Sequence, residues 1–288
     1  MFRLMALFAM LSATLWAQAF PPHRIIGNIY YVGEDDLTSF LIVTPKGNIL
    51  INTGYIYSVP EIKSSIKKLG FHYSDIKILL ITHAHSDHAA GMALIKKQTG
   101  AKMMTMEQER ELLETGGKTD YLFGSSGWFD PVKVDKTFKD GETIELGGTV
   151  ITAHLTPGHT KGSTSYSLEV PENGKKYHVL IANLGVINPG TAFLHNDRYP
   201  NIAKDYARTF EIEKNLPCDV FLSSHAGHYG MQHKFHPGTP YSPETFVDPE
   251  GYLMVVQHFE QVFLRHLEEE RADEQAYQDH LHFKDNVP

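Results

Sequence analysis

The spacing of apolar and polar positions predicts strands in both halves of the chain. In the first half, short apolar runs lie within residues 25–51 between turn-forming residues, and residues 76–82 form a continuous apolar run typical of a buried central strand. Another short strand is expected in the segment AKMMT. In the second half we expect strands in four segments: ETIELGGTVITAHLT, STSYSLEV, KYHVLIANL and DVFLSS.

Helical spacing occurs between and after these strands. The residues Ser58–Glu61 are typical of a capping box, and Ile62, Ile66 and Leu69 share one face of the helix expected there. Further helices are expected over residues 88–98, in MEQERELLETGG and over residues 202–215. A long amphipathic helix should end the fold and fray after Glu268, where the chain becomes highly charged.

Each half of the chain thus contains strands and then helices. We expect two mixed β-sheets packed face to face with helices on their outer faces, a four-layer αββα sandwich of the α/β class. Strand-end loops from both halves would meet at one edge of this sandwich. Because no long linker or low-complexity segment interrupts residues 20–288, they are expected to form a single domain.

Residues 1–19 have the features of a secretory signal peptide. Arg3 precedes an apolar run that reaches Trp16, and the small-residue segment AQA ends at Ala19, where we expect cleavage. A buried N-terminal helix is the alternative. An exported, periplasmic protein is therefore expected, without stable membrane association because no other segment is apolar enough to cross a bilayer.

Composition narrows the functional classes. A net charge of -8 disfavours nucleic acid as a partner, since phosphates are bound by Lys and Arg. Cys218 is the only cysteine, so no disulfide can form within the chain. The 17 histidines are the unusual feature, and they direct attention to metal binding.

Three histidines and an aspartate lie within six consecutive positions of THAHSDHAAG, directly after the buried strand. In an extended segment His83 and His85 point the same way and can bind one ion, whereas Asp87 and His88 can face a second ion where a helix begins. Imidazole and carboxylate ligands suit zinc.

Two further histidines follow other strands. His159 lies in TPGHTKGSTSY and His225 lies in FLSSHAGHYG. Either one alone is more often a solvated or structural histidine than a ligand. Metal-binding residues at three strand ends together favour a shared site, because a catalytic zinc needs about three protein ligands. We expect the neighbouring His228 to be solvated in its loop.

The segments THAHSDHAAG, HLTPGHTKGSTSY, NDRYP and LPCDVFLSSHAG resemble the metallo-β-lactamase superfamily, most closely subclass B3. The resemblance implies two zinc ions per chain and a metal-held hydroxide that hydrolyses the amide bond of β-lactam antibiotics, giving resistance. It also implies a monomer and a catalytic role for Asp87. The implied ligands are His83, His85 and His159 for the first ion and Asp87, His88 and His225 for the second.

The chain departs from the family pattern near the site. Asn52 replaces the usual aspartate of the turn LINTG, and Leu184 and Val186 occupy the stretch where serines usually help to bind the substrate carboxylate. The residues considered for substrate contact are Lys161, Ser163, Ser224, Tyr121 and Trp128.

Two other functions stay open. One is a different hydrolase of the same fold, such as a glyoxalase II-like thioesterase or a lactonase. Those enzymes usually place an aspartate between the metals after the strand KYHVLIANL, but no acidic residue lies between Glu172 and Asp197 here. The other is a zinc-binding protein without catalytic activity.

Overall fold

Two β-sheets face each other in the structure, a computed structural model that describes residues 20–285 and the side chains of residues 20–276. The first sheet has seven strands in sequence order, antiparallel from β1 to β4 and parallel from β4 to β7. Its strands are β1 (His23–Ile26), β2 (Ile29–Tyr31), β3 (Phe40–Thr44), β4 (Gly47–Ile51), β5 (Ile76–Leu80), β6 (Lys102–Met106) and β7 (Lys136–Phe138).

The second sheet has five strands in the order β12-β11-β10-β9-β8, all antiparallel except the parallel pair β11 and β12. Its strands are β8 (Thr143–Leu146), β9 (Thr149–Leu155), β10 (Thr164–Glu172), β11 (Lys175–Ala182) and β12 (Val220–Ser223).

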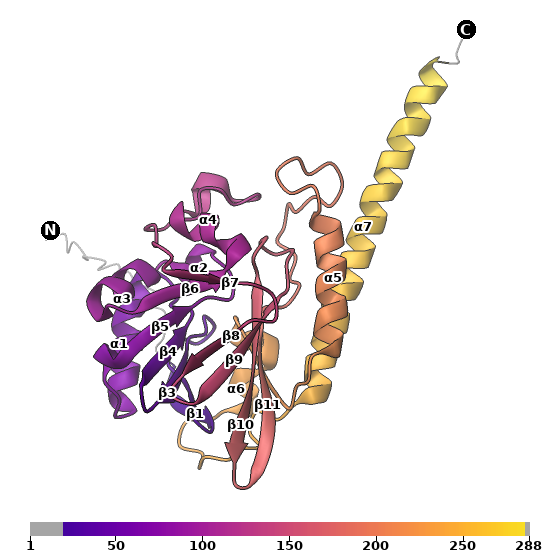
Figure 1. The fold of residues 1–288 in the computed structure, drawn as a ribbon. Coiled ribbons are helices and arrows are strands. Elements are labelled where there is room, and N and C mark those ends of the chain that lie inside the picture. The colour runs from indigo at the N-terminus through magenta and orange to yellow at the C-terminus, as the bar shows by residue number, and fades with distance from the viewer. Residues whose placement is uncertain (1–19, 286–288) are drawn as a thin grey trace, which may run out of the picture.

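Helices cover the outer faces of the two sheets. Figure 1 shows α1, α2 and α3 beside the first sheet and α5 and α7 beside the second. The helices are α1 (Val59–Lys68), α2 (Ser86–Ala89), α3 (Met92–Thr99), α4 (Arg110–Glu114), α5 (Ile202–Asn215), α6 (Met231–Lys234) and α7 (Pro249–Asp285). Short 3₁₀ helices are η1 (Ile56–Ser58), η2 (Tyr73–Asp75), η3 (Glu107–Glu109), η4 (Gly124–Gly127) and η5 (Ala226–Tyr229).

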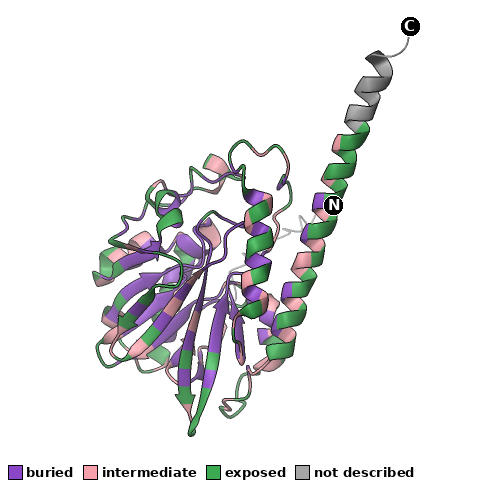
Figure 2. Cartoon of the chain, turned by 45° about the vertical axis from the view of Figure 1, so that its right-hand side comes forward, coloured by how far each residue is buried: buried purple, intermediate pink, exposed green. Residues whose placement is uncertain are grey.

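Alternation along the strands separates two hydrophobic clusters. On β4, Ile49 and Ile51 join the cluster that includes Tyr166 of β10, whereas Leu50 joins the cluster that includes Ile62 of α1. Strand β4 is therefore buried on both faces, and Figure 2 shows that buried residues are concentrated in the strands. The four-layer αββα sandwich is confirmed.

Several local expectations need correction. The segment expected as one helix over 88–98 is broken into α2 and α3 around Gly91, where a side chain would clash with the Thr53 carbonyl at 2.8 Å. Ser58 makes no side-chain capping bond to α1. Helix α7 continues to Asp285 instead of fraying after Glu268, since alanine, glutamate and glutamine in this segment favour a helix.

The expected signal peptide lies outside the described residues. Among the residues that are described, no helix is both long enough and apolar enough to span a membrane.

Candidate metal centre

The loops after β5 and β9 bring three histidines together. Ligand atoms of His83, His85 and His159 all lie within 4.8 Å of one another, and all three residues are buried. Their ring centroids are 4.4 to 4.8 Å apart. This is the group that the sequence predicts as the first metal site.

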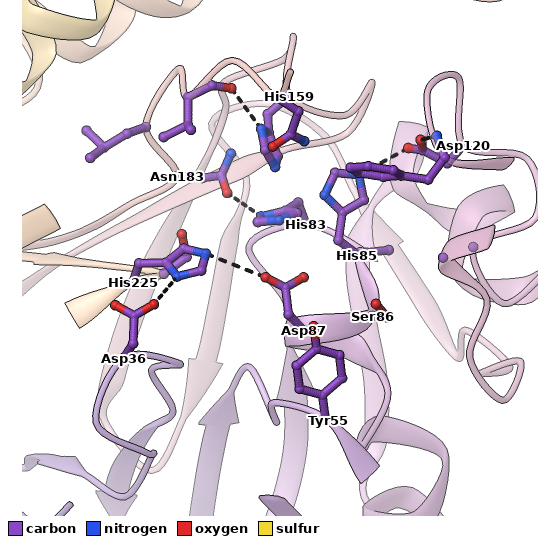
Figure 3. Close-up of a pocket in the computed structure, with 18 of the residues that line it drawn as sticks. Asp36, Tyr55, His83, His85, Ser86, Asp87, Asp120, His159, Asn183 and His225 are labelled. Carbon is purple, nitrogen blue, oxygen red and sulfur yellow. Dashed lines mark hydrogen bonds and ion pairs between the residues drawn. The ribbon is translucent and has the colours of Figure 1, made fainter. Parts of the chain in front are cut away.

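Each of these histidines uses one ring nitrogen to bond an outer partner. Figure 3 shows these bonds directed away from the centre of the group. A histidine held in this way presents its other nitrogen to a metal in a fixed orientation. The bonds join His83 Nδ1 to Asn183 Oδ1 (2.6 Å), His85 Nε2 to Asp120 Oδ2 (3.1 Å) and His159 Nδ1 to the Val186 carbonyl oxygen (2.8 Å).

A second group lies beside the first and shares His83 with it. Ligand atoms of His83, Asp87 and His88 are within 4.8 Å of one another. His225, after β12, directs Nε2 to Asp87 Oδ2 at 3.5 Å, and Asp36 accepts a hydrogen bond from His225 Nδ1 at 2.8 Å. The structure therefore gathers the predicted second set of ligands next to the first set.

His88 indicates that a cation belongs here. Its ring is fully buried, and neither ring nitrogen has a hydrogen-bond partner in the described protein, although Nε2 lies 3.1 Å from Asp87 Oδ2. The backbone of His88 is held by Thr53, whose N–H and hydroxyl both donate to the His88 carbonyl. A buried, rigid imidazole without a partner is costly unless a ligand completes it. The donor set of imidazoles and one carboxylate fits zinc.

The protonation states of three of the histidines also suit metal binding. Burial lowers the pKa of His83 and of His88, and it lowers the pKa of His159 to about 3, so these rings are neutral. Burial alone would raise the pKa of Asp87, but the neighbouring histidines, His88 first, hold it below its usual value. Burial opposes protonation of His225, yet its hydrogen bonds to carboxylates raise its pKa to about 9.

Asn52 holds the end of the strand that carries the first ligands. Its Oδ1 accepts from the Thr82 N–H at 3.0 Å and its Nδ2 donates to the Thr82 hydroxyl at 3.1 Å. The backbone of Asn52 is left-handed (φ 61°), a conformation that asparagine tolerates better than most residues. An amide can thus orient the residue before His83 without the negative charge of the usual aspartate.

A cavity of about 540 Å³ opens over both groups of ligands. Polar lining residues include Ser86, Asn188 and Ser224, and none of the described residues in the lining is a lysine or an arginine. Leu184 and Val186 also line it, as expected for the stretch in which family members usually carry substrate-binding serines. Of the five residues considered for substrate contact, Ser224 alone is in the lining.

The other four candidates lie elsewhere. Lys161 is exposed, with Nζ 5.4 Å from the centre of the Tyr199 ring. Ser163 is buried and bonds Thr160. Tyr121 is buried, and Trp128 is 61% exposed. Their roles toward substrate stay predictions.

Besides the proposed metal ligands, three aromatic or imidazole side chains outside these five candidates also line the cavity: Tyr55, Phe123 and His228. Phe123 lies against His85 with ring centroids 5.1 Å apart. His228, expected to be solvated, is half-buried instead, because the turn after His225 folds back as η5 and brings His228 Nδ1 within 3.3 Å of the Ser223 hydroxyl.

Sequence reasoning did not find the partners of the histidines. Asp120 and Asn183 are ordinary residues in loops that follow other elements, and no local spacing marks them. Asp36 had a weak signal, because it lies in the run Asp35–Ser39 that resembles the entry segment of subclass B3.

Comparisons with known proteins agree with this arrangement. A family model described as "Metallo-beta-lactamase superfamily" matches residues 32–171. The chain is 47% identical to the FEZ-1 metallo-β-lactamase from Legionella gormanii, with a TM-score of 0.86, over 89% of this chain and 98% of that one. It is 42% identical to the class B3 di-zinc metallo-β-lactamase LRA-12 from an Alaskan soil metagenome, with a TM-score of 0.85, over 90% and 98%.

Similarity to curated proteins is more limited. The chain is 34% identical to a hydroxyacylglutathione hydrolase of Hyphomonas neptunium over 85 residues, which are 30% of this chain and 26% of that protein. The chain therefore spans about a quarter of the length of this curated relative.

Proposed function

Because the chain belongs to the metallo-β-lactamase superfamily, we propose that it hydrolyses the amide bond of β-lactam antibiotics with two bound zinc ions and thereby gives antibiotic resistance. The observation that carries this proposal is the pair of adjacent ligand groups that share His83, of which His83, His85, Asp87 and His159 line one cavity. The similarity to class B3 di-zinc enzymes over nearly their full length supports the same substrate class and metal.

Different side chains have different roles at this site. Zinc, when bound, supplies a Lewis acid for a carbonyl and makes hydroxide available at neutral pH. The three histidines with lowered pKa values bind a cation without first releasing a proton, whereas His225, whose pKa is raised, must release one; Asp87 adds the negative charge that a dication favours. Asp36 and Asp120 orient His225 and His85 and add further negative charge around the site.

The cavity suits a small bicyclic substrate in size, since pockets for ligands of that kind occupy about 300–1,000 Å³. Its described lining offers hydroxyl and amide donors at Ser224 and Asn188 but no lysine or arginine for the substrate carboxylate. We therefore propose that neutral donors hold this carboxylate, and that binding of substrate is weaker than a paired charge would allow.

Thioesterase or lactonase activity is the less favoured function. The first residue after β11, where those enzymes usually supply an aspartate to the metals, is Asn183, and its Oδ1 accepts a hydrogen bond from His83. A carboxylate that could lie between two metals is thus replaced by an amide that orients one ligand.

The proposal also includes export of the protein from the cytoplasm. We propose that residues 1–19 are a signal peptide cleaved near Ala19 and that residues 20–288 act as a single, monomeric domain in the periplasm. N-terminal sequencing of the protein from a periplasmic extract would reveal the cleavage site.

One comparative assay tests the proposed activity. The zinc-loaded protein is assayed with a chromogenic cephalosporin and, in parallel, with a glutathione thioester. We expect opening of the β-lactam ring, loss of that activity with a chelator and no comparable thioester hydrolysis. Thioester hydrolysis without β-lactam turnover would contradict the proposal in favour of the glyoxalase II-like function, and zinc binding without either activity would favour the non-catalytic one.

A further inference from the structure

A buried carboxylate behind the first histidine group has no part in the proposed function so far. Glu109 is the last residue of η3, which follows β6, and it is 1% exposed. Its oxygens accept hydrogen bonds from the Ala84 N–H (2.5 Å), the Thr160 hydroxyl (2.8 Å) and the Gly162 N–H (2.9 Å). A buried carboxylate is costly unless it is satisfied, and here three donors from outside its own element satisfy it.

These donors come from the two loops that carry the first group of ligands. Ala84 lies between His83 and His85, and Thr160 directly follows His159. The carboxylate therefore bridges segments that are 25 and 51 residues away from it in sequence. It does so without a direct hydrogen bond to any of the three histidine rings.

The packing around this bridge is close. A Cβ atom added to Gly162 would lie 2.3 Å from the Glu109 backbone nitrogen and 2.6 Å from the Glu109 Cβ, so only glycine allows the loop to approach η3 this far. A further bond from the Thr164 N–H to the Thr82 carbonyl (2.7 Å) joins the same two loops on their other side. The separation of the loops is therefore set at two points.

We propose that Glu109 is a positioning residue for the first zinc ion, holding the loop of His83 and His85 and the loop of His159 at the separation that one metal needs. This inference rests on the proposed zinc hydrolase. A carboxylate is suited to the task because both oxygens only accept hydrogen bonds. A glutamine of the same shape has one accepting oxygen, so its NH₂ group would face a backbone N–H and leave that donor unpaired.

The test compares Glu109→Gln with Glu107→Gln, a matched control that changes an exposed glutamate in the same 3₁₀ turn. Stepwise zinc binding constants are measured by competition with a chromophoric chelator, and His159→Ala identifies which step belongs to the first group. The melting temperature of each zinc-free protein is measured in parallel. We expect Glu109→Gln to weaken zinc binding at the first site by about 10–100-fold, the usual effect of losing an outer partner. The binding constant of the second site, and both constants of the Glu107→Gln control, should stay within about twofold of the wild-type values.

Other outcomes overturn the inference. A lower melting temperature with unchanged zinc constants would make Glu109 a structural residue only, and equal weakening of both sites would make its effect general. If Glu109→Gln does not fold, Thr160→Val keeps the carboxylate and removes one donor, and it must still weaken the first site a few-fold; unchanged affinity would contradict the proposal. Failure of the wild-type protein to bind any zinc would instead refute the proposed function, and this inference with it.

Discussion

At the scale of single residues, the outer hydrogen bonds decide which nitrogen of each histidine faces the metal. His83 and His159 bond outward through Nδ1, whereas His85 bonds outward through Nε2. The three rings therefore present different nitrogens to a common centre.

We expect His159→Ala and His85→Ala each to reduce activity at least about 100-fold, because each removes a ligand from the site that polarises the substrate carbonyl. His228→Ala should stay within a few-fold of wild type, because His228 lines the cavity but belongs to neither ligand group. Steady-state kinetics at saturating zinc measure both effects. If His228→Ala were as damaging as His159→Ala, the assignment of ligands after β12 would be wrong.

His23 gives the stability of the protein a dependence on pH. It is buried and stacked on Phe235 with ring centroids 3.7 Å apart, and burial lowers its pKa to about 4 from 6.5. The unfolded chain binds the proton more tightly than the folded protein does. The contribution of neutral His23 to folding stability is therefore present above about pH 6.5 and is lost as the pH falls toward 4. This shift in pKa corresponds to a change of at most about 3 kcal/mol in the free energy of unfolding.

The variant His23→Phe should therefore lose less stability in acid than the wild type. Between pH 7 and 4.5, we expect the free energy of unfolding of the wild type to fall by about 2 kcal/mol more than that of His23→Phe. Urea unfolding with a chelator present, to exclude zinc release, measures the difference. The exposed His72→Phe is the control, and parallel pH profiles for wild type and His23→Phe would contradict the prediction.

The sequence indicated the candidate ligands but not the residues that hold them. His83, His85, Asp87 and His88 are close in sequence, so their spacing alone indicates a metal site. Glu109 and residues such as Asp120 act only after folding brings distant loops together, and nothing in their local sequence separates them from ordinary surface acids. Long-range contacts of this kind are absent from periodicity and spacing.

At the scale of elements, the pattern predicted the buried strands and α5 well because burial on one or both faces leaves a clear period. The pattern was less accurate for the helix ends that tertiary contacts determine. At the break between α2 and α3 the Gly91 N–H donates to the Gly54 carbonyl (3.2 Å), which lies outside both helices. The length of α7 follows from the helix propensity of its residues, which the high charge of this segment concealed.

The segment after β11 should control the affinity for substrate. Val186 is half-buried in the cavity wall, and its carbonyl holds His159, so a change of its side chain leaves that bond intact. We expect Val186→Ser to lower KM more than it raises kcat, because a new donor for the carboxylate binds substrate and transition state alike.

Lys161→Ala provides the comparison for this test. Since Lys161 is exposed and outside the cavity lining, its removal should leave KM within about twofold. Steady-state kinetics on one cephalosporin and one carbapenem measure both variants. An unchanged KM in a folded Val186→Ser protein, together with a large rise in Lys161→Ala, would mean that the lysine holds the carboxylate.

At the scale of the whole molecule, the site exists only because two sheets meet at one edge. The proposed ligands follow β5 in the first sheet and β9 and β12 in the second, and hydrogen bonds such as that from the Thr164 N–H to the Thr82 carbonyl join the two sides. The sandwich itself could be predicted because each half repeats strands and helices. The distance between the halves could not, since it depends on packing.

The central claim is that two zinc ions held by these ligands drive β-lactam hydrolysis, and a zinc titration tests it most directly. Metal-free protein is titrated with zinc while turnover of a chromogenic cephalosporin is followed. We expect activity to rise with added zinc and to reach its plateau at two equivalents per chain. A plateau at one equivalent would contradict the two-ion site, and absence of turnover with two zinc ions bound would contradict the proposed activity.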